Sequence, residues 1–271
     1  VLFRSGKSIM KTIQGLLKLK NQDEKISMVT CYDFTSAKIV NESDIDLVLV
    51  GDSAAMVIHG YENTIPASIN MMATHVSAVH RGLPNKFLVA DMPFLAHRKD
   101  RDTVMISVET IMKAGANSVK IEGGKGHIDI IRHIVESGVP VMGHLGLTPQ
   151  SVNMVGGWKV QGRTDDVATQ LIQDAQDLEK AGIFALVLEM VPADLAKKVT
   201  EGLDIPTIGI GAGPDTSGQV LVFQDLLGMN PEFNPTFLRK YADGFSVIKD
   251  ALNEFTSDVK SGNFPNEEES F

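Results

Sequence analysis

The sequence predicts a (β/α)₈ TIM barrel, with one helix before the first strand and further helices after the last. Short apolar runs alternate along the chain with longer amphipathic runs, as in a parallel sheet whose strands are joined by helices. There are eight such short runs, the number of strands that closes this barrel. The length of 271 residues is ordinary for one barrel domain.

The eight predicted strands are four to six residues long and mostly rich in Val, Ile and Leu, as expected of strands buried on both faces. They are Ile26–Thr30, Asp46–Val50, Phe87–Asp91, Ser118–Glu122, Val139–His144, Ala185–Glu189, Thr207–Ile210 and Val220–Phe223. An open doubly wound sheet is the alternative. It often carries a GxGxxG motif after its first strand, and the glycines at 209, 211 and 213 have the wrong spacing for it.

Helical patterns lie between most of these strands, and glycines follow their ends. The patterns cover Ala67–His80, Thr103–Lys113, Ile128–Glu136 and Asp166–Lys180. A helix over Ser8–Lys20 precedes the first strand, where it could cover the bottom of the barrel. One or two closing helices are expected between Pro235 and Val259.

Composition narrows the class of protein. No linker or low-complexity stretch interrupts the chain, so we expect a single domain over residues 1–271, with residues 1–7 disordered or not native to it. A net charge of -9 disfavours nucleic-acid binding, and no apolar run is long enough to span a membrane. Cys31 is the single cysteine, which suits a reducing compartment, and we expect a cytoplasmic protein.

One connection is much longer than the usual two to six residues of a βα loop. Leu145–Thr164 shows little helical pattern and contains the single tryptophan, Trp158. Such long loops in compact domains are commonly binding loops or lids. We expect this segment to help close a site or hold a ligand.

Four of the predicted strands end in an acid, namely Asp52, Asp91, Glu122 and Glu189. Acids are 34 of 271 residues, so about one strand end in eight would carry one by chance. Some acids after strands only cap the next helix, and this explanation fits Asp33 best. In a barrel, the carboxyl ends of all strands meet at one mouth, where active sites lie. The sequence therefore predicts an acid cluster at that mouth.

Such a cluster repels itself unless a cation neutralises it or some acids stay protonated. Oxygen ligands favour Mg²⁺ or a similar hard ion. Zinc fits less well, since no two of the seven histidines have the i, i+4 spacing of a helical zinc site.

Glu189 and two further residues, Lys120 and His144, are candidates for chemistry. Lys120 shares a strand face with Glu122, so it meets either an anionic ligand or a neighbouring acid in a structural ion pair. Glu189 follows an apolar run, and burial would raise its carboxyl pKa toward that of a general base, although a metal ligand or a structural carboxylate is the alternative. His144 could orient a substrate or be structural. The glycines at 209–213 are most simply turns, and Cys31 is most simply a core residue.

Several strings of residues, taken together, resemble the ketopantoate hydroxymethyltransferase family from about Met10 to the C-terminus. They are Val50-Gly-Asp-Ser53, Ala90-Asp-Met-Pro93, Val119-Lys-Ile-Glu-Gly-Gly124, Gly143-His-Leu-Gly-Leu-Thr-Pro-Gln-Ser-Val-Asn153, Lys159-Val-Gln-Gly162, Leu188-Glu-Met-Val-Pro192 and Ile208-Gly-Ile-Gly-Ala-Gly213. The long string that begins at Gly143 is the most specific. The chain departs from the family at Ala54-Ala55, where Leu-Gly is frequent, and near its end at Glu268-Glu269, where relatives often show His.

The resemblance implies a barrel that binds Mg²⁺ through Asp52, Asp91 and Glu122. It implies that Asp52, Ser53, Asp91 and Lys120 contact a 2-oxo acid, to which our reading of the residues adds His144. It implies that Glu189 is the proton acceptor, and that the protein forms a homo-oligomer, typically a decamer.

The implied reaction transfers a hydroxymethyl group from 5,10-methylenetetrahydrofolate, the co-substrate, to 3-methyl-2-oxobutanoate through a Mg²⁺-stabilised enolate. Two alternatives remain at this point. One is a Mg²⁺-dependent carbon–carbon lyase of the isocitrate lyase kind, which typically uses a Cys base in its own motif. The other is a non-catalytic oligomeric binding protein on the same fold.

Overall fold

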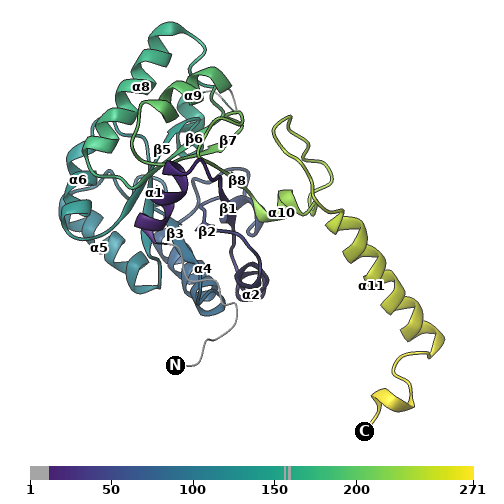
Figure 1. Ribbon diagram of the computed structural model, residues 1–271. Coiled ribbons are helices and arrows are strands. Elements are labelled where there is room, and N and C mark those ends of the chain that lie inside the picture. The colour runs from purple at the N-terminus through teal and green to yellow at the C-terminus, as the bar shows by residue number, and fades with distance from the viewer. Residues whose placement is uncertain (1–11, 156, 158–159) are drawn as a thin grey trace, which may run out of the picture. The chain divides into compact units, whose positions relative to one another are not determined.

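The computed structural model describes residues 12–155, 157 and 160–271. Eight parallel strands close a barrel in sequence order, with β8 paired back to β1 (Figure 1). The strands are β1 Ile26–Thr30, β2 Leu47–Val50, β3 Phe87–Asp91, β4 Ser118–Glu122, β5 Val141–Gly146, β6 Ala185–Glu189, β7 Thr207–Ile210 and β8 Gly218–Leu221. The prediction of a (β/α)₈ barrel is confirmed.

Helices join most of the neighbouring strands and cover the outside of the barrel, and one further helix precedes β1 (Figure 1). They are α1 Ile13–Asn21, α2 Phe34–Glu42, α3 Ala54–Val57, α4 Ile69–Gly82, α5 Arg101–Lys113, α6 Ile128–Glu136, α7 Val152–Val155, α8 Asp165–Lys180 and α9 Ala193–Glu201, with a 3₁₀ turn over Pro149–Ser151. Asp33 caps α2 as expected, because its carboxylate accepts a hydrogen bond from the Ser36 amide at 2.9 Å.

Alternate residues along each strand point into the barrel, and their apolar members form the central core. This core includes Met28 of β1, Leu49 of β2, Val89 of β3 and Val187 of β6. Leu16 and Leu19 of α1 belong to the same cluster, so the first helix covers one end of the barrel as expected. The expected start of this helix at Ser8 lies partly outside the described residues, and so do residues 1–7.

Two predicted strands are shifted by two residues. β5 begins at Val141 rather than Val139, since Pro140 has no N–H to donate to a neighbouring strand. β8 begins at Gly218, a residue that strand propensity disfavours. Glycine is needed here, because a Cβ atom would lie 2.3 Å from the Ile26 carbonyl oxygen of β1.

The chain divides into two compact units, one up to Leu221 and the other from Val222 to Phe271. The second unit contains α10 Phe223–Leu226, α11 Gly244–Ser261 and a 3₁₀ turn over Glu267–Glu269. The expected closing helix therefore starts at Gly244, where Asp243 accepts a hydrogen bond from the Ser246 amide at 3.2 Å, and residues 235–243 are not helical. The single-domain assignment over 1–271 stays a prediction. Within the described residues, no helix is both long and apolar enough to cross a membrane.

Candidate active site

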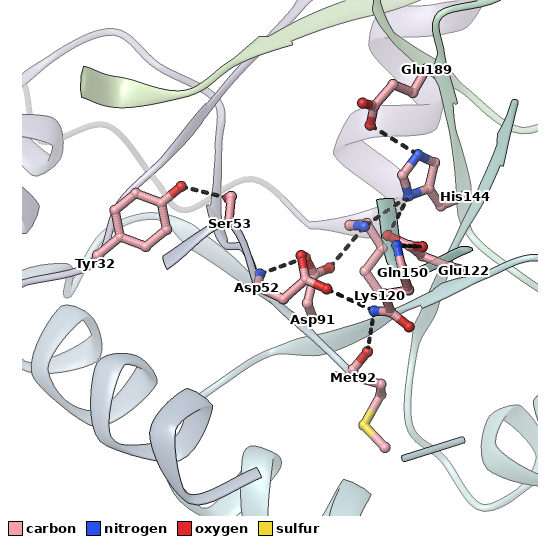
Figure 2. Close-up of polar contacts among 10 residues, drawn as sticks. All are labelled: Tyr32, Asp52, Ser53, Asp91, Met92, Lys120, Glu122, His144, Gln150 and Glu189. Atoms are coloured by element: carbon pink, nitrogen blue, oxygen red, sulfur yellow. Dashed lines mark hydrogen bonds and ion pairs between the residues drawn. The ribbon is translucent and has the colours of Figure 1, made fainter. Parts of the chain in front are cut away.

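The alternation of side chains brings five of the predicted site residues into one place. Asp91 shares the inward face of β3 with Val89, and Glu189 shares that of β6 with Val187. Lys120, Glu122 and His144 occupy the corresponding positions at the carboxyl ends of β4 and β5. Strand register then pairs Asp91 with Lys120 and Glu122 with His144 (Figure 2). The predicted convergence of strand-end acids at one mouth of the barrel is what the structure shows.

Asp52 and Ser53 join this cluster from the turn after β2. The Asp52 amide donates to Asp91 Oδ2 at 2.9 Å, which fixes the turn against β3. Gly51 permits the tight turn, since a Cβ atom there would lie 2.7 Å from Ser53 Oγ. The loss of the family's frequent Leu-Gly at Ala54-Ala55 has not opened this region, because both alanines are fully buried.

Burial and like charge dominate the electrostatics of the acids. Asp52, Asp91 and Glu122 are each at most 5% exposed. Burial, followed by repulsion from Asp91 and Glu122, raises the pKa of Asp52 well above its ordinary value. Burial also raises the pKa of Asp91, although the Lys120 charge opposes this. The cluster is therefore short of positive charge.

Lys120 is the cation at the centre of the cluster. Its Nζ lies 2.9 Å from Asp91 Oδ1 and 3.1 Å from His144 Nδ1. Burial alone would lower its pKa, but Asp91, Glu122 and Asp52 raise it above the ordinary value, so the side chain stays charged. The ion pair between Lys120 and a neighbouring acid, one of the two predicted roles of this lysine, is therefore present. Even with this pair, the cluster contains more carboxylates than cations.

His144 lies between Glu122 and Glu189, the predicted base (Figure 2). Its Nδ1 lies 3.4 Å from Glu122 Oε1, and its Nε2 lies 3.3 Å from Glu189 Oε2. Burial and the Lys120 charge lower its pKa, but hydrogen bonding to Glu122 and Glu189 outweighs both and raises the pKa to about 9. The same contact, with the Lys120 charge, outweighs burial at Glu122 and lowers the pKa of that carboxyl. Glu189, 16% exposed at its side chain, is the most accessible acid of the four.

Two residues of the site were not singled out individually from the sequence. Gln150 lies in the 3₁₀ turn after β5 and donates from Nε2 to Asp52 Oδ2 at 2.8 Å. Tyr32 lies after β1, and its hydroxyl is 2.7 Å from Ser53 Oγ. Both fall beside residues of interest only once the barrel closes, so no local pattern marks them. The family string from Gly143 to Asn153 contains Gln150, and it was the one available signal for it.

The donor set suits a hard divalent cation by its chemistry. Within the described part of the chain, no three His, Cys, Asp or Glu side chains are placed to hold one ion together. Lys120 forms an ion pair with Asp91 Oδ1, and Gln150 donates a hydrogen bond to Asp52 Oδ2, so each of these oxygens already faces a polar group of the chain. The donors are nevertheless all oxygens, buried and mutually repelling, which is the environment that Mg²⁺ relieves. The magnesium set of Asp52, Asp91 and Glu122 stays a prediction.

The long loop after β5 contains more structure than its sequence suggested, namely the 3₁₀ turn and α7. Its far end is also anchored, because the Gln161 amide donates to the Met190 carbonyl, next to Glu189, at 2.8 Å. Trp158 and Lys159 lie outside the described residues. The loop therefore contacts the acid cluster at its near end, through Gln150, and the backbone next to Glu189 at its far end.

Cys31 is fully buried, as expected of a core residue. Burial raises the pKa of its thiol to about 11, which disfavours the thiolate that a cysteine base requires.

A closed parallel barrel with a buried cluster of acids, a lysine and a histidine at the carboxyl ends of its strands is the architecture of a barrel enzyme. The model of the family described as ketopantoate hydroxymethyltransferase matches residues 10–267. The chain belongs to this family, and it is therefore an enzyme.

Similar proteins agree with this assignment. A 3-methyl-2-oxobutanoate hydroxymethyltransferase of Bdellovibrio bacteriovorus is 53% identical over 262 residues, covering 97% of this chain and 100% of the relative. One of Francisella tularensis is 51% identical over 96% of this chain and 98% of its own. One of Coxiella burnetii is 53% identical over 92% of this chain and 94% of its own.

Solved structures show the fold alone. A phosphonopyruvate hydrolase in complex with oxalate and Mg²⁺ has a TM-score of 0.60 at 12% identity, over 96% of this chain and 93% of that one. A 2,3-dimethylmalate lyase of the PEP mutase/isocitrate lyase superfamily has a TM-score of 0.59 at 14% identity, over 97% of this chain and 92% of that one. These neighbours are TIM barrels and support the fold class.

Proposed function

We propose that the protein transfers a hydroxymethyl group from 5,10-methylenetetrahydrofolate to 3-methyl-2-oxobutanoate, giving ketopantoate for pantothenate biosynthesis. The names of its relatives support the activity. The observation that supports the chemistry is a buried cluster at the mouth of the barrel, made of Asp52, Asp91, Lys120 and Glu122. His144 connects this cluster to Glu189 (Figure 2).

Mg²⁺ would be held by Asp52, Asp91 and Glu122, and when bound it would supply Lewis-acid polarisation of the substrate ketone. Lys120 would offset the charge of the substrate carboxylate, with Ser53 as a hydrogen-bond partner. The buried walls would exclude water from the reacting carbon.

Glu189 would act as the general base. Its carboxylate takes the proton from C3 of the 2-oxo acid, and the electron pair left on C3 is delocalised toward the ketone oxygen. C3 then forms a bond to the methylene carbon of the folate as the bond of that carbon to N10 breaks, and N10 takes up the proton held by Glu189. The oxygen of a water molecule bonds to the same carbon as its bond to N5 breaks, and a proton of that water goes to N5. The products are the hydroxymethylated 2-oxo acid and tetrahydrofolate. His144 Nε2 faces Glu189 Oε2, and it would hold the carboxylate in position and offset part of its negative charge.

The test is deuterium exchange at C3 of the 2-oxo acid in D₂O with Mg²⁺ and without folate, followed by NMR. Glu189→Gln should slow this exchange at least ~100-fold while 2-oxo acid binding, measured by calorimetry, is kept. The matched control is Glu201→Gln, an exposed residue, which should exchange at the wild-type rate. Exchange at the normal rate in Glu189→Gln would show that another group is the base.

The same preparation separates the proposed reaction from a lyase. Product should form only when methylenetetrahydrofolate is supplied, and a chelator should abolish it. Cleavage of a carbon–carbon bond in the 2-oxo acid without folate would contradict the proposed transfer.

A further inference from the structure

Gln150 is a buried neutral side chain inside the acid cluster. It is 5% exposed and lies in the Pro149–Ser151 turn, outside the strands that supply the acids. Figure 2 shows its carboxamide nitrogen between Asp52 and the Met92 carbonyl, and its backbone nitrogen facing Glu122. The mechanism proposed above does not use it.

All donors of Gln150 point at the ends of other strands. Its Nε2 donates to Asp52 Oδ2 at 2.8 Å and to the Met92 carbonyl at 2.9 Å. Its backbone N–H donates to Glu122 Oε2 at 3.1 Å. One residue of the loop after β5 thus contacts the ends of β2, β3 and β4.

These contacts orient carboxylates without neutralising them. A hydrogen bond from an amide fixes one oxygen of Asp52 and one of Glu122, and so restricts where their remaining lone pairs can point. A lysine at this position would also cancel the negative charge that attracts a cation, whereas glutamine adds no charge. Groups that hold metal ligands in this way typically change metal affinity 10–100-fold when removed.

We propose that Gln150 is the positioning residue for Asp52 and Glu122 as metal ligands, and that metal binding and ordering of residues 147–155 are therefore linked. The inference rests on the proposed function, because it assumes that these acids hold Mg²⁺. Linkage is reciprocal: if the ordered segment raises metal affinity, the metal stabilises the segment by the same factor.

The alternative is that Gln150 only fastens the loop to the barrel. A fastening role predicts a looser loop when Gln150 is changed, with metal affinity unaltered. A positioning role predicts that both change together.

The experiment compares the full chain carrying Gln150→Met with wild type and with Met154→Ala. Methionine keeps the length and removes both side-chain N–H donors, whereas Met154 is 87% exposed and serves as the control in the same segment. Mg²⁺ alone is titrated by calorimetry, and amide hydrogen exchange of residues 147–155 is followed with and without Mg²⁺.

Gln150→Met should bind Mg²⁺ about 10–100-fold more weakly, and saturating Mg²⁺ should restore kcat to within about threefold of wild type. In wild type and Met154→Ala, Mg²⁺ should slow exchange of the segment by a similar factor, and this slowing should be smaller in Gln150→Met, whose backbone N–H can still donate to Glu122. Gln150→Asn keeps the amide but is one carbon shorter, so its Mg²⁺ affinity should lie between those of wild type and Gln150→Met. This variant replaces Gln150→Met in the comparison if Gln150→Met does not fold.

Two results would overturn the proposal. Mg²⁺ affinity within twofold of wild type in both variants would leave Gln150 as a fastening residue. Exchange of the segment that does not respond to Mg²⁺ in wild type would remove the linkage. Failure of the wild-type chain to bind Mg²⁺ is a different outcome, since it contradicts the metal part of the proposed function as well.

Discussion

At the scale of single residues, the site depends on pairs whose members come from different strands. Lys120 is charged because Asp91 faces it, and His144 has a raised pKa because Glu122 and Glu189 flank it. Tyr32 plays a similar part for Ser53, since its buried hydroxyl lies 2.7 Å from Ser53 Oγ. Burial raises the pKa of the Tyr32 phenol, so this group remains a neutral hydrogen-bonding partner.

Tyr32→Phe tests whether this hydroxyl positions Ser53. One hydrogen bond contributes about 0.5–1.5 kcal/mol, so we expect KM for the 2-oxo acid to rise roughly 3- to 10-fold with kcat little changed. Steady-state kinetics of Tyr32→Phe, Ser53→Ala and the double variant measure the effect. Because Tyr32 would act through Ser53, its change should add nothing in the Ser53→Ala background, and additive effects would refute the pairing.

At the scale of elements, β5 and β6 approach each other unusually closely where they end. Gly146 closes β5 at φ +93°, and the Leu147 amide donates to the Glu189 carbonyl at 2.8 Å. A Cβ atom on Gly146 would lie 2.2 Å from that carbonyl oxygen. Met190, directly after Glu189, has a left-handed φ of 50°, which few non-glycine residues adopt. The backbone on both sides of the base is therefore tightly constrained.

Gly146→Ala should displace the end of β6 and, with it, Glu189. A misplacement of this order can reduce kcat about 100-fold. We expect that loss together with a fall in the free energy of unfolding of about 1–3 kcal/mol, measured by urea denaturation.

Gly138→Ala is the matched control for this substitution. Its φ is +89°, so it carries the same backbone strain, but its Cβ would meet nothing within 4 Å. It should lose stability without losing activity. Equal kinetic losses in the two variants would show that the close approach to Glu189 is not what matters.

At the scale of the whole molecule, the barrel carries two buried histidines to which the proposed mechanism assigns no role. His97 and His127 lie in the loops after β3 and β4, with ring centroids 4.8 Å apart, and each is at most 5% exposed. Burial, with the charges of His127 and Arg98, lowers the pKa of His97 to about 3. Burial and Arg98 lower that of His127 to about 4. Both rings are therefore neutral in the folded protein.

Acid should destabilise the protein through this pair. The folded-state pKa values lie below the ordinary 6.5, so the unfolded chain binds these protons first as the pH falls. The stability that the neutral rings preserve is complete above pH 6.5 and is lost progressively as the pH falls toward 4 and 3. Between pH 7 and 5 each histidine should cost about 2 kcal/mol, so the pair should cost on the order of 4 kcal/mol.

The measurement is urea denaturation at pH 7 and pH 5. The double variant His97→Gln/His127→Gln should lose less stability over this interval than wild type, and His133→Gln should behave as wild type. An unchanged loss in the double variant would assign the acid sensitivity to other groups.

The second unit exposes apolar side chains. Its helix α11 contains no buried residue, and Val247, Leu252 and Phe255 are among its exposed apolar side chains. The homo-oligomer, expected as a decamer, and the cytoplasmic location both stay predictions.

The sequence by itself determined the barrel and the position of the acids along it. Strand periodicity is a property of the local backbone, so the parity that puts Lys120 and Glu122 on one face of their strand can be read from a single run of residues. Family strings added Ser53. The position predicted for β8 was wrong by two residues. Gly218 begins this strand because the Ile26 carbonyl of β1 lies too close for any side chain there, and the sequence does not show that contact.

Only the tertiary structure decided which of these side chains touch. Gln150 and Asp52 lie 98 positions apart, and Tyr32 meets Ser53 across the ends of two strands. Such contacts depend on strand register, on barrel closure and on the backbone hydrogen bonds of loops. These are long-range geometric conditions, and no spacing within one segment encodes them.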